Sequence, residues 1–180
     1  MHSAAPPDTA AGLITRPPMV AAHRPLSSVL RLADTGFAAP RALLARYGLA
    51  LVEIAPACPI PGSYWGECEA GVIGGTVYAR ADTPLHSLLH EACHMIVLPP
   101  AWRAQVHTDA TDSIEEEDAT CYLQIVLADD LPGVGRARMQ ADMDAWGYSF
   151  RLGNARAWFE RDAAEARALL VGRGLLPAGA

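Results

Sequence analysis

Apolar residues recur with helical spacing along most of this chain, and they form short unbroken runs in two places. We expect helices that begin at Leu26, Pro40, Thr83, Ser113, Arg136 and Ala155, the third ending near Val97 and the last two at Trp146 and Leu170. The two apolar runs, Leu49 to Ile54 and Val72 to Arg80, predict strands. The pattern therefore predicts an α+β fold, with a short mixed or antiparallel sheet packed on helices.

The first 25 residues differ from the rest of the chain. They are rich in Ala and Pro and show no sustained periodicity, so we interpret residues 1–25 as a flexible N-terminal arm. The remainder, residues 26–180, is expected to form a single domain. The 180 residues are 51% hydrophobic, which is enough to bury a core without disulfides or a second domain.

Charge and hydropathy exclude several classes of partner. The formal net charge is −6 and the arginines are scattered, which argues against a nucleic-acid surface. No apolar stretch approaches the roughly 18 to 20 residues that span a bilayer, and the N-terminus does not resemble a secretory signal. We therefore expect a cytoplasmic protein with no membrane segment. The spacing of the four cysteines matches no paired zinc-knuckle pattern, which favours reduced thiols.

One short motif carries chemistry. The sequence His90-Glu91-Ala92-Cys93-His94 places two histidines at i and i+4, on one face of a predicted helix and one turn apart. Two imidazoles so placed can hold one Zn²⁺ together. The intervening Glu91 is then placed to take a proton from a water whose pKa the zinc lowers to about 7. The alternative reading of His90 and His94 is an ordinary pair of half-buried helical histidines.

A third protein ligand is expected from the acidic run Glu115 to Asp118. This run begins 21 residues after His94, at the start of a predicted helix. Acidic residues are favourable at a helix N-terminus in any case, so most of them need no role beyond solvation. From the residues alone, Glu115, Glu116 and Glu117 remain open as the ligand.

The motif and its surroundings resemble the gluzincin metallopeptidases, especially the minigluzincins and the ImmA/IrrE-type bacterial domain. The resemblance covers about half the chain, from GVIGGTVYAR through HEACH to EEEDATCYLQIVL. It implies a small zincin-like fold in which an edge strand precedes the active-site helix and a second helix donates a glutamate within a Glu-x-x-Ala-(Asn/Asp) pattern. Aligning that pattern on Ala119 implies Glu116 as the third zinc ligand. The next position is Thr120, where the family has Asn or Asp, so the contact that orients a ligating histidine departs from the pattern.

The expected function is that of a zinc-dependent hydrolase, a small metallopeptidase with Glu91 as general base and His90, His94 and Glu116 as metal ligands. The substrate would be a peptide or protein paired with the edge of the strand VIGGTVYAR. His107 and Tyr148 are rival donors for the developing oxyanion. His86, one turn before His90, is expected at the surface or as a cap, with a hydrogen bond to the substrate as the alternative. No second domain is apparent that could form the other wall of a substrate cleft. We therefore expect that wall to come from a homodimer, from a partner protein or from an ordered arm.

Two other functions remain open. The first is a regulatory or catalytically silent metal-binding protein of the same fold. Glu91 argues against it, because an enzyme that had lost its activity would be expected to lose this glutamate. The second is non-haem iron chemistry, because two histidines and one carboxylate also form a facial triad. Such triads usually lie on a β scaffold, whereas this motif is predicted to be helical.

Overall fold

The computed structural model describes residues 29–64, 66, 68–108 and 113–179. The predicted arm, residues 1–25, and the expected helix start at Leu26 lie outside these residues. The described part is an α+β domain, as predicted. Its elements are α1 Leu32–Thr35, α2 Ala38–Ala45, β1 Ala50–Glu53, β2 Gly71–Ile73, β3 Thr76–Ala79, α3 Leu85–Val97, α4 Pro100–Arg103, α5 Ile114–Leu127, a 3₁₀ turn Ala128–Asp130, α6 Gly135–Trp146, α7 Ala155–Arg161 and α8 Ala164–Gly172.

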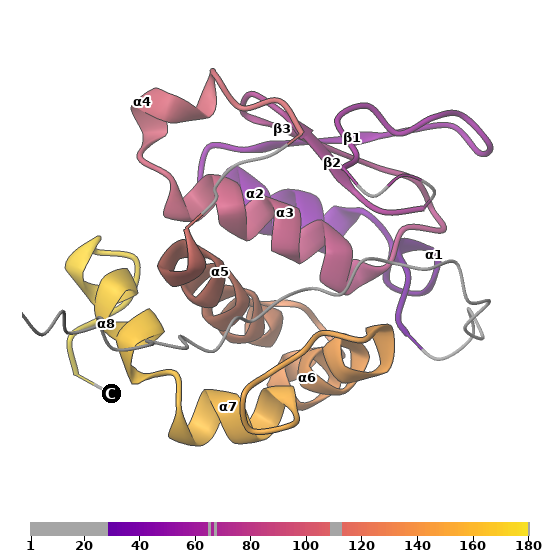
Figure 1. The fold of residues 1–180 in the computed structure, drawn as a ribbon. Helices are drawn as coiled ribbons and strands as arrows, with labels where there is room; N and C mark the ends of the chain where they lie inside the picture. The colour runs from indigo at the N-terminus through magenta and orange to yellow at the C-terminus, as the bar shows by residue number, and fades with distance from the viewer. Residues whose placement is uncertain (1–28, 65, 67, 109–112, 180) are drawn as a thin grey trace, which may run out of the picture.

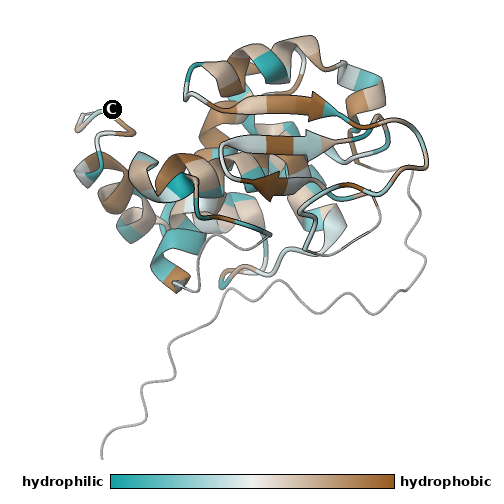
Figure 2. Cartoon of the chain, turned by 90° about the horizontal axis from the view of Figure 1, so that it is seen from above, coloured by the Kyte–Doolittle hydropathy of each residue, from teal (hydrophilic) through white to brown (hydrophobic). Residues whose placement is uncertain are grey.

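The sheet has three strands in the order β1-β3-β2. Strand β3 runs parallel to β1 and antiparallel to β2, as the arrows in Figure 2 show. The single strand expected over Val72 to Arg80 is therefore wrong: the segment is a hairpin. It turns at Gly74, whose φ of 56° is readily adopted only without a side chain. As a result β3 is the central strand of the sheet, and β2 is an edge strand.

Helix α3 lies under the sheet and forms the centre of the molecule (Figure 1). All of its residues are buried except His94, because the sheet covers one side and α5 packs on another. The helix begins at Leu85, two residues later than expected. The hydroxyl of Thr83 does not cap it but accepts a hydrogen bond from the backbone N–H of Arg80 at 2.9 Å.

The C-terminal third of the described chain is helical and packs beneath α5 (Figure 1). The single helix expected from Ala155 to Leu170 is divided into α7 and α8, because Asp162 leaves helical geometry at φ −135°. Its carboxylate instead receives two hydrogen bonds from Arg151, both 2.6 Å long. Within the described residues, none of the helices has the length and apolar character that a membrane crossing requires.

Candidate metal centre

The two motif histidines lie side by side on α3. Their Nε2 atoms are 3.0 Å apart, and their ring planes are nearly perpendicular, with centroids 4.5 Å apart. This placement follows from the i, i+4 spacing on a helix that forms as predicted. His90 is buried, whereas the side chain of His94 remains 11% exposed. The pair therefore presents two ring nitrogens to one point at the edge of the core.

Glu117 of α5 completes the group. Its Oε1 lies 3.4 Å from His90 Nε2 and its Oε2 lies 3.2 Å from His94 Nε2. One ligand atom from each of the three residues lies within 4.8 Å of the others, which makes this a group able to hold a metal ion. The structure thus brings Glu117, rather than the expected Glu116, to the histidines.

Glu116 is held elsewhere by the C-terminal part of the chain. Its Oε1 accepts a hydrogen bond of 2.5 Å from Arg173 Nη2, while Nη1 of the same guanidinium donates to the carbonyl of Val97 at 2.7 Å. Successive residues on a helix point about 100° apart, so a helix that aims Glu117 at α3 turns Glu116 away. The residue that the pattern aligned on Ala119 implies, Glu116, therefore lies away from the histidines in this structure, and its neighbour Glu117 lies beside them.

The spacing of these three groups is compatible with one metal ion, and a tetrahedral zinc ion gives a scale for it. Zn–N and Zn–O bonds of about 2.0 to 2.1 Å at tetrahedral angles place ligand atoms about 3.3 Å apart. The two histidine Nε2 atoms are 3.0 Å apart, and the Glu117 carboxylate spans them, with Oε1 at 3.4 Å from His90 Nε2 and Oε2 at 3.2 Å from His94 Nε2. Three protein ligands of this kind leave the fourth position of a tetrahedron open, as in catalytic zinc sites.

The orientation of His90 is set by Gln124. The Gln124 Nε2 donates to the carbonyl of His86 at 2.9 Å, so its Oε1 is the atom that faces His90 Nδ1, at 3.2 Å. An amide oxygen only accepts, and the proton of His90 must therefore reside on Nδ1. In the neutral ring, the Nε2 lone pair is then directed at the metal position, which is the usual arrangement in metal sites.

His94 and Glu117 also have partners on α5. Thr120 Oγ1 lies 3.3 Å from His94 Nδ1, and the Cys121 thiol donates to Glu117 Oε1 over 3.8 Å. Thr120 therefore occupies the position that was in doubt from the sequence, and a hydroxyl contacts the histidine there. Glu117, Thr120, Cys121 and Gln124 are spaced i, i+3, i+4, i+7, so one face of α5 supports the site. That periodicity is the sequence signal that distinguishes Glu117 from its neighbours.

Asp118 follows Glu117 and is directed about 100° away from it around α5. Burial, with a smaller contribution from the charge of Glu117, raises its pKa to about 6, and the charges of Arg151 and Asp162 also act on it. Among the described residues, its Oδ1 has no hydrogen-bond partner. Asp118 therefore belongs to the contact with the C-terminal segment rather than to the histidines.

Glu91 is buried beside the histidines, with 7% of its surface exposed. It follows His90 directly and lies one turn after Ser87, whose Oγ accepts a hydrogen bond from the Ala70 N–H at 3.0 Å. Ser87, Glu91 and His94 are spaced i, i+4, i+7 and therefore lie along one side of α3. A cation at the neighbouring site would further favour the charged form of this buried carboxylate.

Of the two candidate hydrogen-bond donors to an oxyanion, Tyr148 and His107, Tyr148 is the one that lies beside the histidines. Its buried ring meets His90 edge-on with centroids 5.6 Å apart, and it meets His86 in the same way at 5.7 Å. His86 itself is fully buried and packs on Trp146, so the expected surface or capping role is wrong. His107, the other candidate donor, is exposed at the edge of β2 and contacts Thr108.

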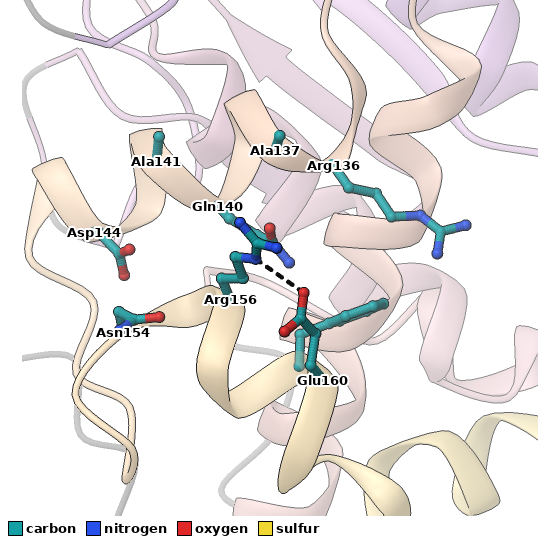
Figure 3. A pocket seen from close by; sticks show the side chains of 9 residues that line it. Arg136, Ala137, Gln140, Ala141, Asp144, Asn154, Arg156 and Glu160 are labelled. Carbon is teal, nitrogen blue, oxygen red and sulfur yellow. Dashed lines mark hydrogen bonds and ion pairs between the residues drawn. The ribbon is translucent and has the colours of Figure 1, made fainter.

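A separate cavity of about 610 Å³ lies between α6 and α7 (Figure 3). Arg156 and Glu160, one turn apart on α7, form an ion pair of 2.9 Å at its wall (Figure 3). It contains none of the residues of the metal group. Its lining residues are Arg136, Ala137, Gln140, Ala141, Asp144, Asn154, Arg156, Phe159 and Glu160.

Comparisons with known proteins return no relative of this chain. No family model matches it, and neither a curated protein nor a solved structure is significantly similar. The geometry of the site is therefore the basis on which a function can be assigned.

Proposed function

We propose that the protein is a zinc-dependent hydrolase, and most specifically a small metallopeptidase. The observation that carries this proposal is the convergence of His90, His94 and Glu117 within 4.8 Å, with the buried carboxylate of Glu91 on the same helix. The donor set of two imidazoles and one carboxylate is that of catalytic zinc sites in peptidases.

Each residue then has a defined role. Zinc in such a site lowers the pKa of a water molecule to about 7 and polarises a carbonyl group. Glu91 accepts the proton of the attacking water and passes it to the leaving amine, for which its place beside His90 is suited. Tyr148 is the residue we assign to the oxyanion, because its ring packs on His90 whereas His107 lies at the sheet edge.

Metal content tests the ligand set. We expect about one zinc per chain in the wild type, measured by elemental analysis, and its loss in His94→Ala and Glu117→Ala. Glu116→Ala is the matched control, since its carboxylate pairs with Arg173 and should leave the zinc in place. Loss of zinc in the Glu116 variant alone would return the ligand role to that residue. Iron in place of zinc would favour the facial-triad chemistry.

Turnover tests the enzymatic part of the proposal. Cleavage of a peptide library should depend on zinc and should fall by several orders of magnitude in Glu91→Gln, which retains shape but cannot accept a proton. Tyr148→Phe should retain zinc and lower kcat by about 100-fold, whereas His107→Ala should not lower kcat to that extent. A protein that holds zinc at His90, His94 and Glu117 without any Glu91-dependent cleavage would instead support a regulatory metal-binding function.

A further inference from the structure

The outer edge of β2 is covered by another part of the chain. The segment Val106–Thr108 runs antiparallel to β2, with an isolated bridge between Ile73 and His107. The Gly74 N–H donates to the Val106 carbonyl at 2.9 Å, and the Thr108 N–H donates to the Val72 carbonyl at 3.1 Å. These are the main-chain bonds that an added strand makes, so the segment occupies the position of an extended peptide.

The chain on both sides of this edge is attached to the two helices of the candidate metal centre. Ala70, immediately before β2, is bonded to Ser87 of α3, one turn before Glu91. Beyond Thr108 the chain leads to Ser113, whose side chain caps α5 one turn before Glu117. The chain that enters β2 is thus bonded to α3, which bears Glu91, and the chain that covers β2 leads to α5, which bears Glu117.

Two different segments contact the outer edge of β2, and they are held there to different degrees. At its start, the Val72 N–H donates to the Gly62 carbonyl at 3.2 Å, and a Cβ on Gly62 would lie only 2.3 Å from the Val72 oxygen, so this contact is tightly built. The segment at the other end is anchored by the buried side chain of Val106. It also ends on Thr108 at φ 76°, a left-handed conformation that is strained for a β-branched residue and is relieved if the segment leaves.

We propose that Val106–Thr108 is an internal strand that occupies the substrate-binding edge of β2 and must be displaced before an extended peptide can bind. Its departure releases one acceptor, the Val72 carbonyl, and one donor, the Gly74 N–H. A peptide that runs antiparallel to β2 makes the same two bonds with residues two apart. This inference rests on the proposed peptidase function, and it assigns to that site a resting state closed by the chain itself.

A reversible disulfide tests the inference. Ile73 and His107 face each other as a pair without direct hydrogen bonds between them, in which Cα atoms are about 4.5 Å apart and a disulfide is geometrically allowed. The double variant I73C/H107C, oxidised with glutathione disulfide, should hold the segment on β2. Wild-type protein carried through the same oxidation and reduction controls for Cys58 and Cys68 and for effects on zinc.

Binding is read separately from turnover. In the Glu91→Gln background, fluorescein-labelled casein, an unfolded protein chain, should bind the reduced double variant at least tenfold more tightly than the oxidised one, as measured by fluorescence anisotropy. Reduction with dithiothreitol should restore binding. Equal affinity of the oxidised and reduced forms, or no binding by either, would overturn the inference.

A second variant changes the closed state in the opposite direction. Val106→Ser removes the apolar anchor of the segment, so it should raise casein affinity and kcat/KM by about tenfold. Gln105→Ala, at an exposed neighbouring position, is the matched control and should change neither quantity. An unchanged or lowered kcat/KM in a folded, zinc-loaded Val106→Ser protein would contradict the proposal.

The two proposals fail in different ways. If the wild type lacks zinc or shows no cleavage dependent on Glu91, the peptidase function is wrong, and the comparison of casein binding still decides whether the β2 edge is closed. If zinc and Glu91-dependent cleavage are present but the disulfide changes neither binding nor rate, the function stands and the internal strand is only structural.

Discussion

Gln124 holds His90 by a chain of two hydrogen bonds that runs from one helix to another. Its amide nitrogen donates to the carbonyl of His86 and its amide oxygen faces His90 Nδ1. The direction of the first bond decides the direction of the second, and thereby which ring nitrogen of His90 is available to a metal. A fully buried glutamine on α5 thus determines how a histidine on α3 presents its ligand atom.

Replacement of Gln124 by Met should weaken zinc binding by about 10- to 100-fold, because the side chain keeps its size but no longer orients His90. Zinc affinity can be measured by competition with a chromophoric chelator. Gln140→Met, which alters a buried glutamine on α6 away from the histidines, is the matched control. Equal zinc affinity in the two variants would show that Gln124 serves packing alone.

Thr120 should act on His94 in the same manner. The isosteric change Thr120→Val removes the hydroxyl that lies 3.3 Å from His94 Nδ1, and we expect zinc affinity to fall by about tenfold or more. Thr120→Ser retains the hydroxyl and should stay within about twofold of the wild type. The prediction fails if Val and Ser give the same zinc affinity, since both variants change the packing while only one loses the hydroxyl.

The four cysteines should separate into two classes of reactivity. Burial raises the pKa of the Cys93 thiol, and burial followed by the charge of Glu117 raises that of Cys121. A thiol reagent at pH 8 should therefore modify exposed Cys58 first and partly exposed Cys68 more slowly, since burial also raises the pKa of Cys68. Cys93 and Cys121 should react only after unfolding in denaturant. Rapid modification of either in the native protein would contradict their placement between α3 and α5.

The ion pair between Arg80 and Asp82 should make stability depend on pH in acid. Hydrogen bonds from the Arg80 guanidinium, two of 2.9 Å, lower the pKa of Asp82 below its ordinary value of 3.8. A carboxyl group with a lowered native pKa contributes stability above its unfolded pKa, and this contribution is lost as pH falls through the native pKa.

Asp82→Asn should therefore reduce the free energy of unfolding at pH 7 by on the order of 1 kcal/mol, a modest value because Asp82 is half-exposed to screening solvent. The difference between variant and wild type should shrink below about pH 4. Urea unfolding at pH 7 and at pH 3 measures both. A difference that persists unchanged at pH 3 would assign the effect to shape rather than charge.

The helix that carries the metal motif was predictable from local signals. Apolar spacing and the terminal prolines predict a helix near Thr83 to Val97, and the structure contains it as α3 from Leu85. Once that helix forms, the i, i+4 spacing alone brings His90 and His94 to the same side. The α+β class follows in the same way from the mixture of helical periods and short apolar runs.

Two predictions were wrong for different reasons, one because a local signal was ambiguous and one because the contacts are distant in the sequence. The hairpin at Gly74 was predicted as one strand, because paired glycines within an apolar run are equally compatible with a bulge. His86 was placed at the surface, since nothing near it in the sequence shows that Trp146 and Tyr148 pack against its ring.

The sequence by itself determined the donor types, the face of α3 that bears them and the short list of acidic partners. Only the tertiary structure decided that Glu117 meets the histidines, because the rotation of α5 about its axis is set by packing against α3 and by Arg173, which holds Glu116 from 57 residues away. Spacing along one helix is encoded locally, whereas the relative rotation of two helices depends on side chains that only the folded chain brings together.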